Sequence, residues 1–133
     1  MTLIVDASVA VKWVLPEAGS QAAAALREQD RDLTAPSLIV AEVGNAIWRA
    51  ARSGAVQRSE ATEGLEAALL WFQSLVPLEQ LRSRALTLAI ELKHPIYDCF
   101  YLALAERESA PLVTADEAVI AAARKARIEV RRI

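Results

Sequence analysis

Four acidic residues stand in settings where an acidic side chain is unexpected. Asp98 interrupts the apolar and aromatic run "IYDCFYLALA", and Glu42 is the only charged residue in "LTAPSLIVAEVGNAIW". Asp6 directly follows the apolar run "TLIV", and Asp116 follows "LVTA". An isolated carboxylate is costly to bury, so a buried one is neutralised, paired with a cation or bound to a metal ion. These four residues are therefore the candidates for chemistry in this chain.

Each of the four acids also has an ordinary explanation. Asp98 and Glu42 fall in the first turns of predicted helices, where the helix dipole favours an acid by about 0.3–1 kcal/mol. Asp6 and Asp116 could cap the helices that follow them. Together, however, four carboxylates at one edge would repel by roughly 4 kcal/mol for each pair about 4 Å apart. We therefore expect a cation to offset the repulsion.

The rest of the composition indicates which cation and which chemistry. With one His and one Cys, the chain cannot build a zinc site from these residues, whereas carboxylate oxygens suit Mg²⁺ or Mn²⁺. His94 precedes Pro95 and is expected in a loop or helix cap rather than in a catalytic triad. Neither GxxxxGK[ST] nor GxGxxG occurs, so nucleotide-triphosphate chemistry is unsupported. Carboxylates that hold Mg²⁺ suit hydrolysis of phosphodiesters.

The pattern of apolar residues predicts the elements that position these acids. Strands are expected over residues 2–5, 32–36, 75–78, 111–116 and 128–133. Helices are expected over residues 9–15, 21–29, 38–54, 60–75, 79–93, 95–106 and 117–126, with Ser8 and Ser59 among the expected caps. Alternating strands and helices predict an α/β fold with a parallel sheet and helices on both faces. Ligands bind at the carboxyl ends of such strands, so the four acids should converge there.

Length and composition set the remaining bounds. The 133 residues predict a single domain over 1–133. No apolar run is long enough to span a membrane and no signal peptide is recognisable, so we expect a cytoplasmic protein without membrane contact. The lone Cys99 cannot form an internal disulfide and should be a small buried hydrophobe. With 15 basic and 17 acidic side chains, net charge does not indicate a nucleic-acid binder.

Basic residues are nevertheless clustered. One group lies within the last ten residues of the chain and a looser group lies in its middle. Their members are Arg124, Lys125, Arg127, Arg131 and Arg132, and Arg49, Arg52 and Arg58. The ordinary interpretation of both groups is a solvated face, unless an acidic site lies beside them.

Four segments together resemble one known family. They are "LIVDAS", "APSLIVAEVGNAIWR", "HPIYDCFYLALAE" and "LVTAD", which contain Asp6, Glu42, Asp98 and Asp116. The chain resembles PIN-domain ribonucleases over its whole length, and most closely the VapC-type toxins of type II toxin–antitoxin systems. The order, spacing and total length carry this resemblance, because each short motif is common by itself. It implies a three-layer α/β/α sandwich around a parallel sheet of about five strands.

The resemblance also implies roles for residues. Asp6, Asp98 and Asp116 would hold Mg²⁺ or Mn²⁺, and Glu42 would complete the metal shell or orient the attacking water. Ser8 and Thr114 match positions that support the site by hydrogen bonding, although a helix cap or strand-end hydroxyl explains them equally well. Glu117 could supplement the metal shell or be a solvated acid at a helix start.

The implied activity is metal-dependent endoribonuclease cleavage by the toxin of a toxin–antitoxin pair. Its partners would be an RNA substrate, a cognate antitoxin and a second copy of the chain in a homodimer. Trp48, Trp71 and Phe72 either line such an interface or pack in the core. Arg49 lies seven residues after Glu42, on nearly the same helix face, and is a candidate for substrate contact.

Two alternatives are kept. Phosphatases of the haloacid-dehalogenase type place a second Asp two residues after the first, where this chain has Ser8, and receiver domains need adjacent acids near the first strand. Both are weak. The other alternative is a PIN-like module that binds RNA or protein without catalysis, and the presence of all four acids argues against it.

Overall fold

The structure is a computed structural model that describes residues 1–29 and 31–133. Its strands are β1 Thr2–Val5, β2 Asp32–Pro36, β3 Ser74–Val76, β4 Leu112–Thr114 and β5 Val130–Arg132. Its helices are α1 Ala7–Ala10, α2 Ser20–Arg27, α3 Ile39–Arg52, α4 Arg58–Leu69, α5 Arg82–Leu92, α6 Ile96–Glu108 and α7 Glu117–Lys125. The short 3-10 turns η1 Val11–Trp13 and η2 Leu78–Gln80 complete the set. No helix within these two ranges is long and apolar enough to cross a membrane.

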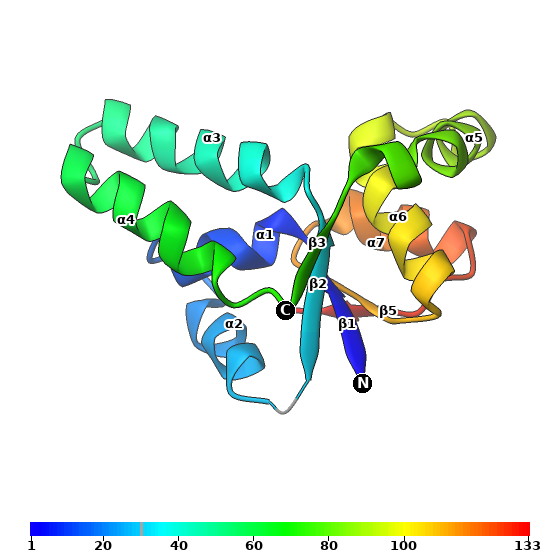
Figure 1. Cartoon of the computed structure of the whole chain (residues 1–133), viewed down its shortest axis with the longest axis horizontal. Coiled ribbons are helices and arrows are strands. Elements are labelled where there is room, and N and C mark those ends of the chain that lie inside the picture. Colours follow the sequence, from blue (N-terminus) through cyan, green and yellow to red (C-terminus); the bar gives the residue numbers. More distant parts are fainter. Residues whose placement is uncertain (30) are drawn as a thin grey trace.

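The strands form one parallel sheet in the order β3-β2-β1-β4-β5 (Figure 1). Strand β1 is its centre, and Leu3, Ile4 and Val5 are fully buried, as expected for a strand covered on both faces. Ile4 is in register with Leu112 of β4. The predicted parallel sheet of about five strands is confirmed.

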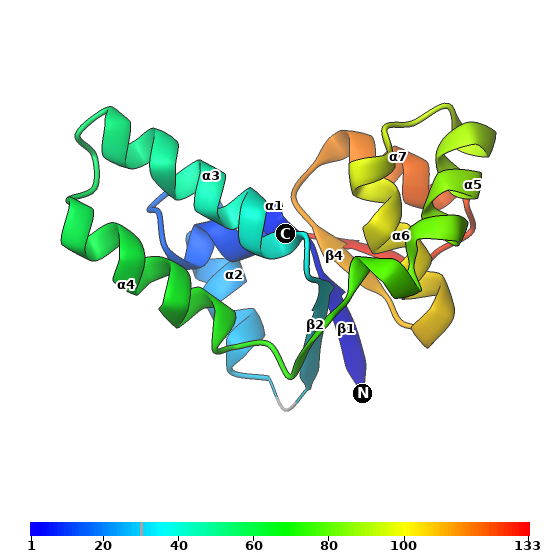
Figure 2. The ribbon, with the colours of Figure 1, turned by 45° about the horizontal axis from the view of Figure 1, so that its top comes forward.

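Helices cover both faces of the sheet (Figures 1 and 2). Because successive strand residues point to opposite faces, Ile4 packs in one cluster with Leu102 of α6. Leu3 packs in the other cluster with Val9 of α1 and Ala23 of α2. In both views α1–α4 lie on one side of the sheet and α5–α7 on the other. The chain thus adopts the three-layer sandwich predicted from its sequence.

The strand order reverses beside β1, and this places the candidate site. Strand β2 lies on one side of β1 and β4 on the other, so the connections after β1 and β4 diverge at their carboxyl ends, where open parallel sheets bind ligands. Asp6 follows β1, and Asp116 follows β4 directly before α7. The first turns of α3 and α6 supply Glu42 and Asp98.

Several predicted boundaries are wrong. Helix α1 begins before Ser8, whose hydroxyl does not cap it, and the helix predicted over 9–15 is instead the short helix α1 followed by η1. Helix α4 begins at Arg58, with Gln57 and Glu60 forming a capping box in place of Ser59. It ends at Leu69 because the following segment joins the sheet edge, where the Gln73 N–H donates to the Leu33 carbonyl at 2.7 Å.

The buried side chains of α6 allow the packing of this helix to be tested. Leu102→Ala should lower the free energy of unfolding by about 2–5 kcal/mol, because Leu102 is fully buried and its truncation leaves a cavity. Leu86→Ala is the matched control: Leu86 is also helical but 53% exposed, and should change that free energy by less than about 0.5 kcal/mol. Urea unfolding measures both, and equal effects would contradict this packing.

Candidate functional site

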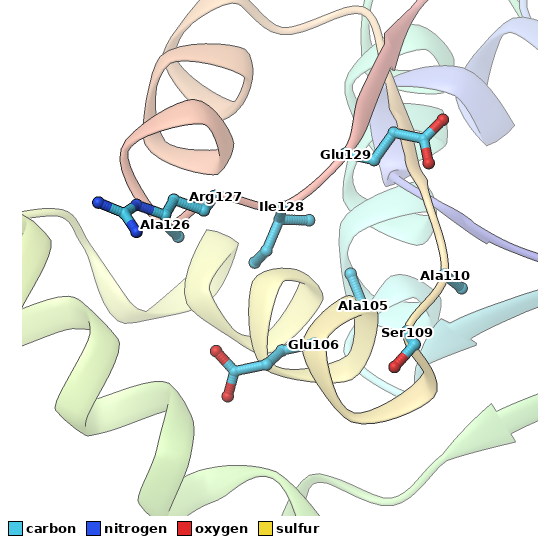
Figure 3. Close-up of a pocket in the computed structure, with 8 residues that line it drawn as sticks. All are labelled: Ala105, Glu106, Ser109, Ala110, Ala126, Arg127, Ile128 and Glu129. Carbon is cyan, nitrogen blue, oxygen red and sulfur yellow. The ribbon is translucent and has the colours of Figure 1, made fainter.

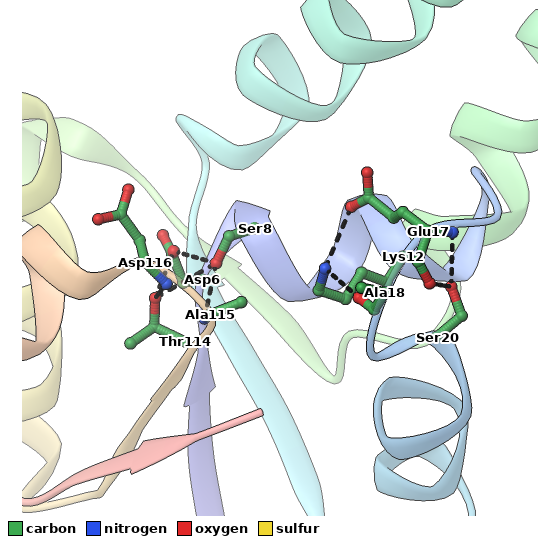
Figure 4. Close-up of polar contacts among 9 residues, drawn as sticks. All are labelled: Asp6, Ser8, Lys12, Glu17, Ala18, Ser20, Thr114, Ala115 and Asp116. Atoms are coloured by element: carbon green, nitrogen blue, oxygen red, sulfur yellow. Dashed lines mark hydrogen bonds and ion pairs between the residues drawn. The ribbon is translucent and has the colours of Figure 1, made fainter.

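Asp6 is the most buried acid at the site. Its side chain is 4% exposed, and its Oδ2 accepts hydrogen bonds from the Ser8 hydroxyl at 2.6 Å and the Thr114 hydroxyl at 2.8 Å (Figure 4). The Ala115 N–H donates to Ser8 Oγ and the Asp116 N–H donates to Thr114 Oγ1, both at 3.0 Å. These backbone donors leave each hydroxyl proton free to point at the carboxylate. Ser8 and Thr114 therefore orient Asp6, and Ser8 is not a helix cap.

Asp116 lies at the start of α7 and caps it. Its Oδ1 accepts hydrogen bonds from the backbone N–H groups of Ala118 at 2.8 Å and Val119 at 3.3 Å. The prediction that Asp116 caps the following helix is thus confirmed for its Oδ1 atom. Within the described ranges no donor contacts Oδ2, so one carboxylate oxygen is available at the sheet edge.

Glu42 and Tyr101 join the two sides of the molecule. The Tyr101 hydroxyl on α6 donates to Glu42 Oε1 on α3 at 2.8 Å, and Tyr101 itself is fully buried. A buried tyrosine needs a partner for its hydroxyl, and Glu42 supplies it. Tyr101 is a site residue that the sequence pattern alone did not single out. Tyr101 lies one turn after Asp98, and this position could have marked it as a candidate. Its partner Glu42, however, is 59 residues away in the chain.

Asp98 has a local partner that was also missed. His94 Nε2 lies 2.6 Å from Asp98 Oδ2, and the two residues are spaced i, i+4 across the start of α6. His94 lies in the loop before α6, as predicted. Its imidazole contacts Asp98 at the acidic edge, which is the end of the sheet where the four acids lie. The i, i+4 spacing could have revealed this contact from the sequence.

The four carboxylates share one electrostatic environment. Burial raises the pKa of Asp6, its hydrogen bonds with Ser8 and Thr114 lower it, and the charges of Asp98 and Asp116 raise it further. Burial raises the pKa of Glu42 to about 7; the Tyr101 hydrogen bond opposes this change, whereas Asp6 and Asp98 add to it. The structure thus brings the four predicted acids to one edge of the sheet.

The chemistry of this donor set fits a hard divalent cation. Among the salt bridges of residues 1–29 and 31–133, no Lys or Arg pairs with any of the four acids. Their described partners are hydroxyl groups at Asp6 and Glu42, the His94 imidazole at Asp98 and backbone N–H groups at Asp116. In the same ranges no three His, Cys, Asp or Glu side chains are already grouped closely enough to hold a metal ion. Metal binding would have to draw the carboxylates together.

Other residues singled out from the sequence lie outside this cluster. Arg49 is exposed on α3. Asn45, which was not predicted, is also exposed and lies between Glu42 and Arg49 along this helix. Trp48 and Trp71 are 54% and 46% exposed. Phe72 instead packs on Trp13 with ring centroids 5.6 Å apart, so its core interpretation is correct.

Cys99 is fully buried directly after Asp98. Burial raises the pKa of its thiol to about 11, with a further contribution from the Asp98 charge. The thiol is therefore protonated at neutral pH and is a small hydrophobe, as predicted.

A separate cavity of about 300 Å³ lies at the opposite edge of the sheet, before the amino ends of β4 and β5 (Figure 3). Glu106, Ser109, Arg127 and Glu129 are among its lining residues. Glu106 is already ion-paired with Arg84 at 2.7 Å. This cavity contains none of the four candidate acids.

Comparison with known proteins identifies the family. A family model described as "PIN domain" matches residues 3–125. The chain belongs to the PIN-domain family. Ribonuclease VapC3 of Pyrobaculum aerophilum is 34% identical over 118 residues, covering 87% of this chain and 90% of that protein. Exonuclease VapC9 of the same organism is 35% identical over 86 residues, covering 63% and 62%.

Solved structures share the fold of this PIN domain. PAE2754 from Pyrobaculum aerophilum is 28% identical with a TM-score of 0.67, covering 92% of this chain and 79% of that one. VapBC2 from Rickettsia felis, bound to a DNA fragment from its promoter, is 16% identical with a TM-score of 0.71 and covers 99% and 98%. FitAcB from Neisseria gonorrhoeae is 17% identical with a TM-score of 0.62 and covers 96% and 95%. At these lower identities the last two show the fold alone.

The environment of Glu42 generates a titration test. In metal-free buffer with EDTA, its carboxyl should titrate near pH 7, because burial and the neighbouring acids disfavour the ionised form. Tyr101→Phe should raise this midpoint, since the hydroxyl that favours the ionised form is lost. Tyr97→Phe is the matched control, because Tyr97 is 63% exposed, and should leave the midpoint unchanged.

Carbon-13 NMR of glutamate side-chain carboxyls measures these midpoints. A wild-type midpoint near 4.5, the ordinary value for Glu, would contradict the described environment.

Proposed function

We propose that this protein is a metal-dependent endoribonuclease that hydrolyses RNA phosphodiesters with Mg²⁺ or Mn²⁺. The observation that carries the proposal is the gathering of Asp6, Glu42, Asp98 and Asp116 at the switch point of the sheet. Membership of the PIN-domain family and 34% identity to a protein named Ribonuclease VapC3 support it.

The four acids would hold the metal ion, with Asp6, Asp98 and Asp116 as the primary ligands. When bound, the ion would activate a water molecule and stabilise the leaving oxygen of the displacement. Ser8 and Thr114 donate to Asp6 and so keep its carboxylate oriented.

Glu42 is suited to a second role beside metal binding. Tyr101 fixes Oε1, which leaves Oε2 to orient the attacking water.

We further propose that the protein acts in the cytoplasm as the toxin of a toxin–antitoxin pair and forms a homodimer. Two exposed faces support partner binding. Trp48 lines a groove of about 690 Å³ between α3 and α4. Ile90 and Tyr97 are exposed where α5 and α6 meet. We propose that these faces receive the antitoxin and a second copy of the chain.

The proposed activity is tested with purified protein and a mixed RNA pool in Mg²⁺, Mn²⁺ or EDTA. Wild type should cleave only with metal, and Asp98→Asn should lower the rate at least about 100-fold, because a metal ligand should matter at least as much as the groups that support one. Asp32→Asn is the control, since Asp32 is exposed at the opposite end of its strand, and should cleave like wild type. A circular RNA in the pool tests endonuclease activity, since it has no ends.

The outcomes separate the alternatives. Cleavage that Asp98→Asn leaves unchanged would contradict the proposed site. Binding of RNA without cleavage under any metal would favour a non-catalytic PIN-like module. Cleavage of linear but not circular RNA would indicate an exonuclease, the activity named for VapC9.

A further inference from the structure

Arg132 lies at the same edge of the sheet as the four acids. It is in register with Thr114 across the β4–β5 pair, and the Ile133 N–H donates to the Thr114 carbonyl at 3.0 Å. Neighbouring strands lie about 4.8 Å apart. The Thr114 hydroxyl donates in turn to Asp6. The backbone of Arg132 is thus one strand spacing from a residue that contacts the buried acid.

The Arg132 guanidinium is held at this edge by an exposed carboxylate. It forms an ion pair with Glu117, the first residue of α7 and the neighbour of Asp116. The two side chains are 52% and 70% exposed. An ion pair between such exposed groups contributes little to stability, so a stronger ligand can replace the carboxylate. A phosphate is such a ligand, because a guanidinium can bind two of its oxygens at once.

The other members of the C-terminal basic group differ from Arg132. Arg131 is the next residue along β5 and therefore points to the other face of the sheet. It pairs with Glu129, which lines the cavity at the opposite edge. Arg124 and Lys125 lie in the last turn of α7, whereas the acidic edge is at the first turn. The C-terminal basic group, which was predicted to be a solvated face, is therefore divided. Arg132 lies beside the acids, whereas Arg124, Lys125 and Arg131 do not.

An RNA strand that enters the site meets an electrostatic barrier. Four carboxylates converge there, and a single divalent ion offsets only half of their negative charge. The phosphates on either side of the reacting one need cations from the protein. The β4–β5 register places Arg132 where it can supply one such cation on the β5 side of the four acids.

We propose that Arg132 binds a backbone phosphate of the RNA substrate, and that Glu117 is its partner when no RNA is bound. The inference rests on the proposed ribonuclease function and adds a substrate contact to it. It also gives Glu117 a role other than the metal ligation considered from the sequence. Release of Glu117 from Arg132 accompanies RNA binding.

The test measures RNA affinity separately from cleavage. A fluorescein-labelled single-stranded RNA 12-mer of mixed sequence is titrated with full-length protein carrying Asp98→Asn, in Mg²⁺, and anisotropy is recorded at several salt concentrations. Arg132→Gln should weaken binding about tenfold, as expected for loss of one charged hydrogen-bonded contact. It should also reduce the slope of log affinity against log salt by about 0.7, the value for one phosphate on a single strand.

Arg84→Gln is the matched control. Arg84 is 46% exposed and also pairs with a glutamate, but that partner, Glu106, lies in the last turn of α6, at the opposite end from Asp98. It should change neither affinity nor slope. Arg132→Lys keeps the charge and should restore most of the slope. Glu117→Gln should tighten binding, because Arg132 then loses its competing carboxylate.

The possible results are distinguishable. Equal affinity and slope for Arg132→Gln and Arg84→Gln would overturn the inference, as would the absence of any RNA binding by wild type. Cleavage of RNA by wild type together with unchanged affinity in Arg132→Gln would overturn only this inference. RNA binding that depends on Arg132 without cleavage by wild type would overturn the proposed enzyme and leave the phosphate contact in place.

Discussion

A carboxylate buried at the centre of a parallel sheet is the constraint on which this structure depends. Asp6 follows the most buried strand and is itself 4% exposed, so its charge must be supported from within the protein. Two hydroxyl groups do this, and each is fixed by a backbone N–H from the segment after β4. The same network therefore joins β1 to β4 across the switch point and holds Asp116 beside Asp6. Local strand ends, helix caps and the acidic site form a single hydrogen-bonded unit.

Helix α6 links this unit to the hydrophobic core. Its buried residues pack against the sheet, while Asp98 and Tyr101, one turn apart, face the acidic edge. Tyr101 reaches across to Glu42 on α3, so two helices from different sides of the sheet are fixed relative to each other. The four acids consequently lie at strand ends or in the first turns of helices, so their backbones are fixed and it is their side chains that would have to move to hold a metal ion.

Much of this arrangement could be predicted from sequence because it depends on local patterns. The run before Asp6 predicts a buried strand, and the isolation of Glu42 and Asp98 in apolar helices marks them as functional candidates. What failed depends on non-local contacts. The end of α4 is set by the pairing of β3 with β2, which overrides a helical pattern. The Tyr101–Glu42 bond and the position of Arg132 follow from tertiary packing and strand register, neither of which periodicity reveals.

Anomalous X-ray diffraction from crystals soaked in Mn²⁺ would show whether the four carboxylates form a divalent metal site. We expect a manganese peak at the carboxyl ends of β1 and β4, within coordination distance of Asp6, Asp98 and Asp116. Because these carboxylates are not yet grouped closely enough to hold an ion, their side chains should move toward the peak. A well-occupied peak elsewhere, or no peak at this edge at saturating Mn²⁺, would contradict the proposed metal site.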